Sequence, residues 1–382
     1  MDLIEFIENE MNIQDKINFS DERKNHIQKL LEKYINEKYD NMTDACLYFT
    51  NEYLEDFQQK ILNINKKKKI VEELIKLKLP EQRSPEWFKQ RKTVLTASSL
   101  ATACDKDFFK SKEELILDKI SVDTPFISNP ITEWGVKYEE IATKFYESLN
   151  NLKILEFGMI CHSRFNIFGA SPDGICSNNS PDKYIGRMLE IKCPPKRKFT
   201  KTVPEHYKMQ IYGQLECCNL EECDFLQVKL EEYINFDDYK KDQYLDVDET
   251  IKNGVNNLNL PKGVTVTYKF NKESDKLQYF YPDLYLSDIE LDNWLKEKKQ
   301  WILSKNYEYV ENKYWKIIRY ECTLVKRDPE WWLETNPLII KFWEEVEYYK
   351  NNKKELLSII ENKKRKKIKI INIQDVDECL LD

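Results

Sequence analysis

The sequence predicts an α/β protein, in which amphipathic helices are combined with short buried strands. From Trp134 onward, apolar residues recur every three or four positions, which is the period of a helix with one buried face. Residues 189–192, Leu-Glu-Ile-Lys, instead alternate between apolar and charged side chains, which is the period of a strand. With 41% hydrophobic and 33% charged residues, the 382-residue chain has enough apolar material for a packed core.

Glycine, proline and tryptophan usage divides the chain into three parts. Residues 1–80 are charged and almost free of glycine and proline, and we expect a helical N-terminal extension there. Residues 81–235 hold six of the eight glycines and the motifs described below, and form the predicted core. Residues 236–382 are aromatic-rich, with a strand-like run at 277–281 and a helix expected at 337–349. This last part is predicted to complete or flank the core.

Charge, hydropathy and cysteine usage exclude several classes of protein. No stretch approaches the roughly 18 apolar residues of a membrane span. The acidic first residues also lack the apolar centre of a secretory signal, so we expect an intracellular protein without a membrane partner. A net charge of −7 argues against indiscriminate polycation binding, although a local basic groove is compatible with it. The ten cysteines contain no Cys-x-x-Cys pair, and a metal cluster would have to start from Cys217, Cys218 and Cys223.

The main chemical signal is the pair of segments around Asp173 and Glu190. Between them, residues 178–182 (Asn-Asn-Ser-Pro-Asp) form a strong turn signal, so a hairpin would bring Asp173 near Glu190. Two carboxylates beside Lys192 make a hard-oxygen site suited to Mg²⁺ or Mn²⁺. Lys192 could then orient a water molecule or help to deprotonate it. Such a site suits the hydrolysis of phosphodiesters.

A structural interpretation of the same residues is a solvated Glu–Lys pair on a surface hairpin. For the Glu-x-Lys tripeptide alone that interpretation is the better one, because the tripeptide is common. The upstream Pro172-Asp173-Gly174 and the flanking motifs favour the metal site instead.

Two predicted helices could contribute further side chains. Glu139 lies just off the buried stripe of its helix, where it either faces solvent or points into a cleft as a third metal ligand. Tyr207, Gln210 and Gln214 share one helix face by their spacing. Gln210 could hold the attacking water or a phosphate oxygen, and Tyr207 could pack on DNA or on protein.

These segments resemble the PD-(D/E)xK nuclease superfamily, and within it the lambda-exonuclease/YqaJ viral recombinase family. The matching segments, in chain order, are residues 83–87 with Arg91 and 95–98, then 133–140, 172–173, 190–194 and 207–210. Their order and spacing carry the resemblance, which extends from residue 83 to about residue 215. It implies a restriction-endonuclease-like core with a central mixed β-sheet flanked by helices, with the helical and α+β parts as extensions.

The resemblance also implies roles for individual residues. Glu139, Asp173 and Glu190 would bind one or two Mg²⁺ or Mn²⁺ ions. The Ile191 carbonyl would be a backbone ligand. Lys192 would orient the attacking water, with Gln210 in support.

A DNA-binding set follows from the same resemblance. Arg91 and Ser98 would grip a 5′-terminal phosphate, to which a guanidinium fork and a hydroxyl are suited. Ser171 could donate to the scissile phosphate, and Tyr207 could pack on the DNA. The basic residues after the Glu-x-Lys strand, beginning with Lys196 and Arg197, would hold the DNA backbone.

The implied activity is 5′-to-3′ degradation of linear double-stranded DNA in viral recombination, repair or defence. The implied partners are DNA, further copies of the chain in a dimer or trimer, and a single-strand annealing protein or helicase. A viral origin would place the protein in the host cytoplasm or a virus factory. The alternatives are an endonuclease, a CRISPR-adaptation-type nuclease and a non-catalytic DNA-end-binding scaffold. A CRISPR-adaptation-type nuclease should carry a four-cysteine cluster, which the cysteine spacing fits poorly.

Overall fold

The computed structural model describes residues 3–38, 43–107, 109–121, 129–196, 198–199, 202–248, 250–274 and 276–363. Arg197, one of the predicted DNA-binding residues, lies outside these ranges. The chain divides into two compact units, one made of Met1–Leu77 with Ser177–Gly186 and the other of Lys78–Cys176 with Arg187–Asp382. The three-part division at residues 80 and 235 stays a prediction.

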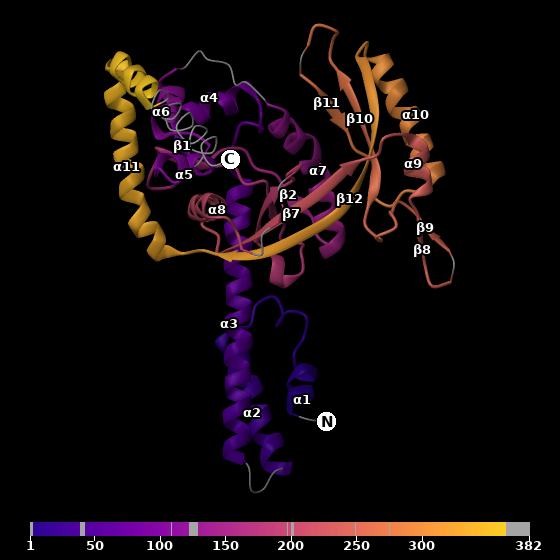
Figure 1. The fold of residues 1–382 in the computed structure, drawn as a ribbon. Coiled ribbons are helices and arrows are strands. Elements are labelled where there is room, and N and C mark those ends of the chain that lie inside the picture. The colour runs from indigo at the N-terminus through magenta and orange to yellow at the C-terminus, as the bar shows by residue number, and fades with distance from the viewer. Residues whose placement is uncertain are drawn as a thin grey trace, which may run out of the picture. The chain divides into compact units, whose positions relative to one another are not determined.

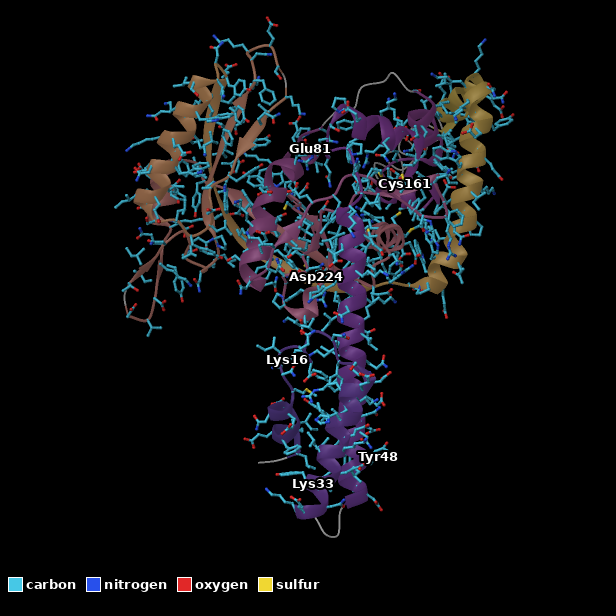
Figure 2. All side chains as sticks on the ribbon, turned by 180° about the vertical axis from the view of Figure 1, so that it is seen from behind. Lys16, Lys33, Tyr48, Glu81, Cys161 and Asp224 are labelled. Carbon is cyan, nitrogen blue, oxygen red and sulfur yellow. The ribbon has the colours of Figure 1, made fainter. Side chains whose placement is uncertain are left out.

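The first unit contains the helices α1 (Leu3–Glu10), α2 (Asp21–Lys38) and α3 (Thr43–Ile75), so the helical character expected for this stretch is confirmed. Lys33 lies in the second half of α2 and Tyr48 in the first turns of α3 (Figure 2). The apolar core of this unit consists of Ile7, Met11, Phe19, Ile27, Leu31, Ile35, Leu54 and Ile61. The segment Ser177–Gly186, with the short helix η2 (Asp182–Tyr184), joins this unit through Asn178, whose side chain donates to the Lys68 carbonyl at 3.2 Å.

The second unit is built around a mixed sheet, as expected. Among the described residues, seven strands pair in the order β11-β10-β12-β7-β6-β5-β2 (Figure 1). They are β2 (Ile154–Leu155), β5 (Gly174–Cys176), β6 (Met188–Lys192), β7 (Glu222–Glu232), β10 (Lys262–Lys269), β11 (Gln278–Phe280) and β12 (Glu308–Lys326). The neighbours β6 and β7 run parallel, and the other pairs run antiparallel.

The long strand β12 links two parts of this unit. One part of its 19 residues pairs with β7 in the core, and the other pairs with β10. Helix α10 (Asp288–Ser304) packs on β10 and β12, whereas helix α11 (Pro329–Asn351) follows the opposite end of β12 (Figure 1). The strand-like run predicted at 277–281 is confirmed by β11.

The helix predicted at 337–349 begins earlier than expected. It starts at Pro329, because the Asp328 side chain accepts a hydrogen bond from the Trp331 backbone N–H and caps the first turn. Pro337, which we expected at the helix start, lies inside the helix.

The second unit also contains a smaller sheet. It contains β1 (Leu95–Thr96), β3 (Ile160–Cys161) and β4 (Phe168–Ala170), in the order β1-β4-β3. The helices packed around it are α4 (Pro85–Thr93), η1 (Ala97–Ser99), α5 (Leu100–Ala103), α6 (Lys112–Ile120) and α8 (Glu205–Cys218). Gly213 lets α8 approach β4 closely, since a Cβ at that position would lie 2.8 Å from the Phe168 ring.

Helix α7 (Pro130–Asn150) confirms the predicted amphipathic pattern. Asn129 caps its first turn, and Pro130 occupies a first-turn position where no intrahelical N–H bond is lost. The buried residues are Tyr138, Ile141, Ala142, Phe145 and Tyr146. The Tyr146 hydroxyl donates to Asp224 of β7 at 2.6 Å, which ties α7 to the sheet; Asp224 is labelled in Figure 2.

The remaining short elements are helix α9 (Phe236–Lys241) and the two-stranded sheet of β8 (Tyr244–Leu245) and β9 (Ile251–Lys252). In the part of the chain that the structure describes, no helix combines the length and the apolar character that crossing a bilayer requires.

Candidate active site

The predicted hairpin brings Asp173 and Glu190 together. Strands β5 and β6 pair antiparallel with Gly174 opposite Leu189, and Asp173 immediately precedes β5. The Ile191 backbone N–H donates to Asp173 Oδ2 at 2.6 Å. The proximity expected from the turn signal is therefore confirmed.

Glu190 is completely buried, and its carboxylate is satisfied by three side-chain donors. Gln210 Nε2 donates to Oε1 and Gln214 Nε2 to Oε2, each at 2.7 Å. The Lys192 ammonium also donates to Oε1. The shared face of α8 predicted from the spacing of these glutamines thus faces β6. A buried carboxylate without such partners would cost several kcal/mol.

Strand β6 is covered on both of its faces, a feature that alternation alone did not predict. Residues Met188 to Ile191 are all buried, and only Lys192 of the strand is partly exposed. Helix α7 packs against β6, where the Cys193 thiol contacts the Tyr138 carbonyl at 3.7 Å. The charged face of β6 is thus enclosed by the α8 glutamines, and a solvated surface pair is excluded.

Lys192 is held in its charged form. Burial would lower the pKa of its ammonium, but the charges of Glu190 and Asp173 outweigh burial, and the pKa lies above its usual value. Its Nζ also lies 4.9 Å from the centre of the Tyr207 ring. Of the two roles expected for Lys192, this environment favours orienting water and stabilising charge over removing a proton.

Glu139 of α7 lies close enough to Glu190 and Lys192 for their charges to shift its pKa. Burial raises the pKa of Glu139 above its usual range, against the opposing charges of Arg83 and Lys192. Burial, followed by the charges of Glu190 and Glu139, raises the pKa of Asp173 well above its usual range. Glu139 Oε2 accepts a hydrogen bond from Arg83 Nη2 at 2.8 Å. The three carboxylates predicted as metal ligands therefore influence one another.

The donor chemistry of this cluster fits a divalent cation, although its side chains do not converge on a single point. In the described ranges, no group of three His, Cys, Asp or Glu residues is arranged to hold a metal ion. Each of the three carboxylates accepts a hydrogen bond from a neighbouring donor. Carboxylate and backbone oxygens are the ligands that Mg²⁺ and Mn²⁺ prefer. Burial, and after it the charges of Glu190 and Glu139, raises the pKa of Asp173, and a bound dication would offset the repulsion between these carboxylates.

The residues predicted to grip a terminal phosphate also lie together. Arg91 Nη2 donates to Ser98 Oγ at 3.3 Å, and the Arg91 guanidinium lies 4.5 Å from the centre of the Trp87 ring. Trp87 Nε1 in turn donates to Ser171 Oγ at 3.0 Å. Burial lowers the pKa of Arg91 to about 10, so the guanidinium is charged at neutral pH. Trp87 thus connects the Arg91–Ser98 pair to Ser171.

Lys119 supports the backbone that carries Arg91, and the sequence analysis did not identify it. Its ammonium donates to the carbonyls of Arg91 at 2.6 Å and Val94 at 2.7 Å, where α4 passes into β1. Burial, followed by repulsion from Arg91, lowers the pKa of Lys119 to about 7. The available signal was a lysine on the same side of α6 as the buried Leu115 and Ile116.

Two other predicted DNA contacts are Tyr207, which lies beside Lys192, and Lys196. The Tyr207 ring packs 5.6 Å from the Phe225 ring, so it contacts protein, one of the two roles expected for it. Lys196 is exposed on the segment after β6.

The cysteine trio and His162 are buried parts of the framework. Cys217, Cys218 and Cys223 are buried, and burial raises the pKa of each thiol. His162 Nδ1 accepts the backbone N–H groups of Arg164 and Phe165, each at 3.1 Å.

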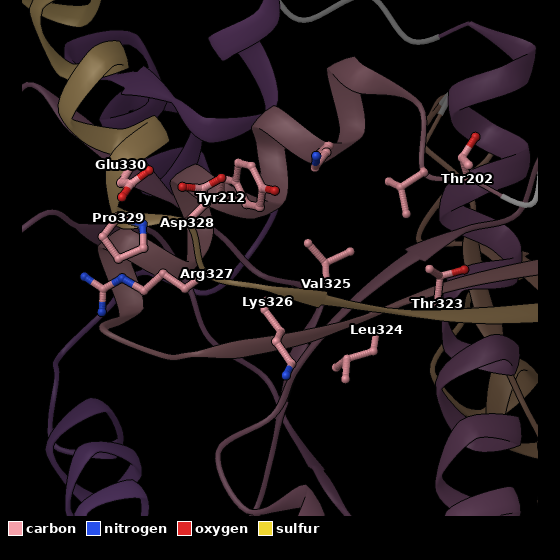
Figure 3. Close-up of a pocket in the computed structure, with 12 residues that line it drawn as sticks. Thr202, Tyr212, Thr323, Leu324, Val325, Lys326, Arg327, Asp328, Pro329 and Glu330 are labelled. Atoms are coloured by element: carbon pink, nitrogen blue, oxygen red, sulfur yellow. The ribbon is translucent and has the colours of Figure 1, made fainter.

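A separate hollow of about 760 Å³ lies beside α8, on residues that do not include the carboxylate cluster (Figure 3). It is lined by Thr202, Val203, Lys208, Tyr212 and residues 323–330. Several of its charges are used structurally. Arg327 forms a two-pronged ion pair with Glu216 at 2.7 Å, and Asp328 caps α11.

Comparison with known proteins finds viral relatives by sequence and weaker likenesses among solved structures. Residues 86–221 match the model of the YqaJ-like viral recombinase domain. An uncharacterised protein of Acanthamoeba polyphaga mimivirus is 33% identical over 306 residues, covering 73% of this chain and 55% of its own length. A protein of African swine fever virus is 26% identical over 160 residues, covering 36% and 46%. The chain therefore spans about half the length of these viral relatives.

The alkaline exonuclease LHK-Exo from Laribacter hongkongensis aligns over 72% of this chain and 100% of its own, with 18% identity and a TM-score of 0.40. A phage-related exonuclease from Haemophilus somnus aligns with 13% identity and a TM-score of 0.34, over 69% and 96%. The matched segment 86–221 contains the β5–β6 hairpin with Asp173, Glu190 and Lys192, and over this segment the chain is similar to the YqaJ-like viral recombinase domain.

Proposed function

We propose that this protein is a divalent-metal-dependent DNA nuclease that degrades linear double-stranded DNA from its 5′ ends. The observation that carries the proposal is the enclosed cluster on the β5–β6 hairpin. There Asp173 and Glu190 lie beside a charged Lys192, and two α8 glutamines hold Glu190 in place. The YqaJ-like domain match supports a nuclease of the viral recombinase type.

Each part of the cluster has a role in this proposal. Glu139, Asp173, Glu190 and the Ile191 carbonyl would hold one or two Mg²⁺ or Mn²⁺ ions, which neutralise phosphate charge and lower the pKa of a bound water. Lys192 would stabilise the negative charge that develops on the phosphate, because its ammonium stays protonated. Gln210 would keep Glu190 oriented through its existing hydrogen bond.

Preference for a 5′ end would come from Arg91, Ser98 and Ser171. A terminal phosphate carries more negative charge than an internal phosphodiester, and a guanidinium with two hydroxyls can bind its additional oxygen. Trp87 fixes the arrangement by contacting both Arg91 and Ser171. Homo-oligomers, an annealing or helicase partner and a location in the host cytoplasm or a virus factory belong to the same proposal.

The test compares linear 5′-phosphorylated, linear 5′-hydroxyl and covalently closed circular duplexes in Mg²⁺. We expect fast loss of the phosphorylated linear DNA, slower loss of the hydroxyl form and an intact circle. Asp173→Ala should abolish cleavage, whereas substitution of Asp182 by alanine should not, because Asp182 is an exposed aspartate in the connection between β5 and β6. Cleavage of the circle would establish an endonuclease. DNA binding without any cleavage would establish the scaffold alternative.

A further inference from the structure

Arg83 has an unusual backbone conformation beside the carboxylate cluster. Its φ angle is 66°, in the left-handed region that residues with a Cβ avoid and that glycine adopts freely. Arg83 lies directly before Ser84, which caps α4. Strained backbone of this kind persists where the surrounding contacts hold it.

Contacts of Gln82 and of Arg83 itself hold this turn in position. The neighbouring Gln82 side chain donates to the Phe157 carbonyl at 2.8 Å and to the Pro172 carbonyl at 3.1 Å. These two hydrogen bonds anchor the turn beside Pro172, the residue directly before Asp173. The Arg83 guanidinium itself donates to Glu139 Oε2 at 2.8 Å, across 56 positions of sequence.

The ion pair places a fixed positive charge on one of the carboxylates that would hold the metal. A dication that uses Glu139 has to share it with the guanidinium, and the two positive charges repel each other. Arg83 also keeps the Glu139 carboxylate oriented, so its effect on cation binding combines repulsion with positioning.

We propose that Arg83 is a positioning residue that lowers the affinity of the Glu139–Asp173–Glu190 cluster for divalent cations through its contact with Glu139. This inference rests on the proposed function, since it takes the cluster to be the metal site. It assigns to Arg83 a role in setting how much metal the protein requires.

The test is calorimetric titration of the full chain with Mn²⁺ in the absence of DNA. Arg83→Gly and Arg83→Asn both suit the left-handed backbone, so both should fold, and denaturant unfolding checks this. Each should bind Mn²⁺ more tightly than the wild type, by a factor on the order of ten. Arg83→Lys, which keeps the charge, should stay closer to the wild-type affinity.

Two controls isolate the contact with Glu139. Lys298→Gln removes one positive charge that is paired with Glu297 on α10, and it should leave Mn²⁺ affinity unchanged. In a Glu139→Gln background, adding Arg83→Gly should no longer tighten binding, because the ion pair is already lost.

The outcomes separate this inference from the proposed function. If Arg83→Gly and Arg83→Asn bind Mn²⁺ with wild-type affinity and Asp173→Ala abolishes binding, the role of Arg83 is overturned. The assignment of the cluster as the metal site is then unaffected. Tightening that persists in the Glu139→Gln background would overturn the route through Glu139. A wild-type chain that binds no Mn²⁺ would overturn both.

Discussion

Single side chains decide whether the charged centre of this protein is stable. Glu190 is fully buried and accepts hydrogen bonds from Lys192, Gln210 and Gln214. Hydrogen bonds to a buried charge contribute more than neutral ones, and a lost partner leaves the carboxylate partly unsatisfied. The α8 glutamines therefore stabilise the fold as well as the site.

Gln214→Met should lower the free energy of unfolding by about 1–2 kcal/mol, because it removes one donor to Glu190 while conserving side-chain volume. Urea unfolding at neutral pH measures the change. In a Glu190→Gln background the same substitution should cost less, since the carboxylate charge is gone. An unchanged unfolding midpoint would show that Gln214 contributes nothing to holding Glu190.

Lys119 predicts a pH dependence of stability. Its pKa in the folded protein is about 7, against 10.5 for a lysine side chain free in water. Between these pH values the folded state therefore binds fewer protons than the unfolded state. Stability should therefore rise with pH from about 7 to about 10.5. Below pH 7 the cost of burying the charged ammonium is fully present.

Unfolding free energies of the wild type and Lys119→Met at pH 6, 7, 8 and 9 measure this contribution. Above pH 7 the free energy of unfolding of the wild type should rise relative to that of the variant, by at most about 1.4 kcal/mol per pH unit. Parallel pH profiles would mean that Lys119 keeps an ordinary pKa in the folded protein.

At the scale of elements, the approach of α8 to β4 places the glutamines against β6. Gly213 makes the approach possible, because a Cβ there would meet the Phe168 ring at 2.8 Å and the Ala97 Cβ at 3.3 Å. Phe168 is fully buried and has little room to move. Packing at this contact therefore outweighs the poor helix propensity of glycine.

Gly213→Ala should destabilise the protein by about 1–3 kcal/mol, even though alanine is the better helix former. The matched control is Gly135→Ala in α7, where an added Cβ meets nothing within 4 Å. That substitution should stabilise by about 0.5–1 kcal/mol. Denaturant unfolding of both variants measures the difference, and stabilisation of both would contradict close packing of α8 on β4.

At the scale of the whole molecule, the two compact units differ in what they contain. The proposed metal site lies in the second unit, as do all eight tryptophans, whereas the first unit consists of helices without tryptophan. Tryptophan fluorescence thus reports on the second unit alone, and circular dichroism at the helix wavelength reports on both.

Mg²⁺ should raise the thermal midpoint seen by fluorescence, since a ligand at 100 times its Kd stabilises the folded state by about 2.7 kcal/mol. Circular dichroism should show a helical component that does not shift. Asp173→Ala should remove the fluorescence shift. Equal shifts in both signals would show that the units unfold together.

Local patterns in the sequence predicted those parts of the protein that depend on near neighbours. The helical period predicted α7, the turn signal predicted the β5–β6 hairpin, and the spacing of Gln210 and Gln214 placed both on one face. These features follow from backbone periodicity and turn chemistry over a few residues. Motif spacing also predicted the YqaJ-like domain match and the mixed sheet.

Contacts between distant segments were decided by the tertiary structure. Arg83 meets Glu139 across 56 positions, and Trp87 meets Ser171 across 84. The enclosure of Glu190 on a strand covered on both faces depends on how α7, α8 and β7 pack around β6. No local period encodes these contacts, because they arise when elements far apart in the chain bury their apolar faces against one another.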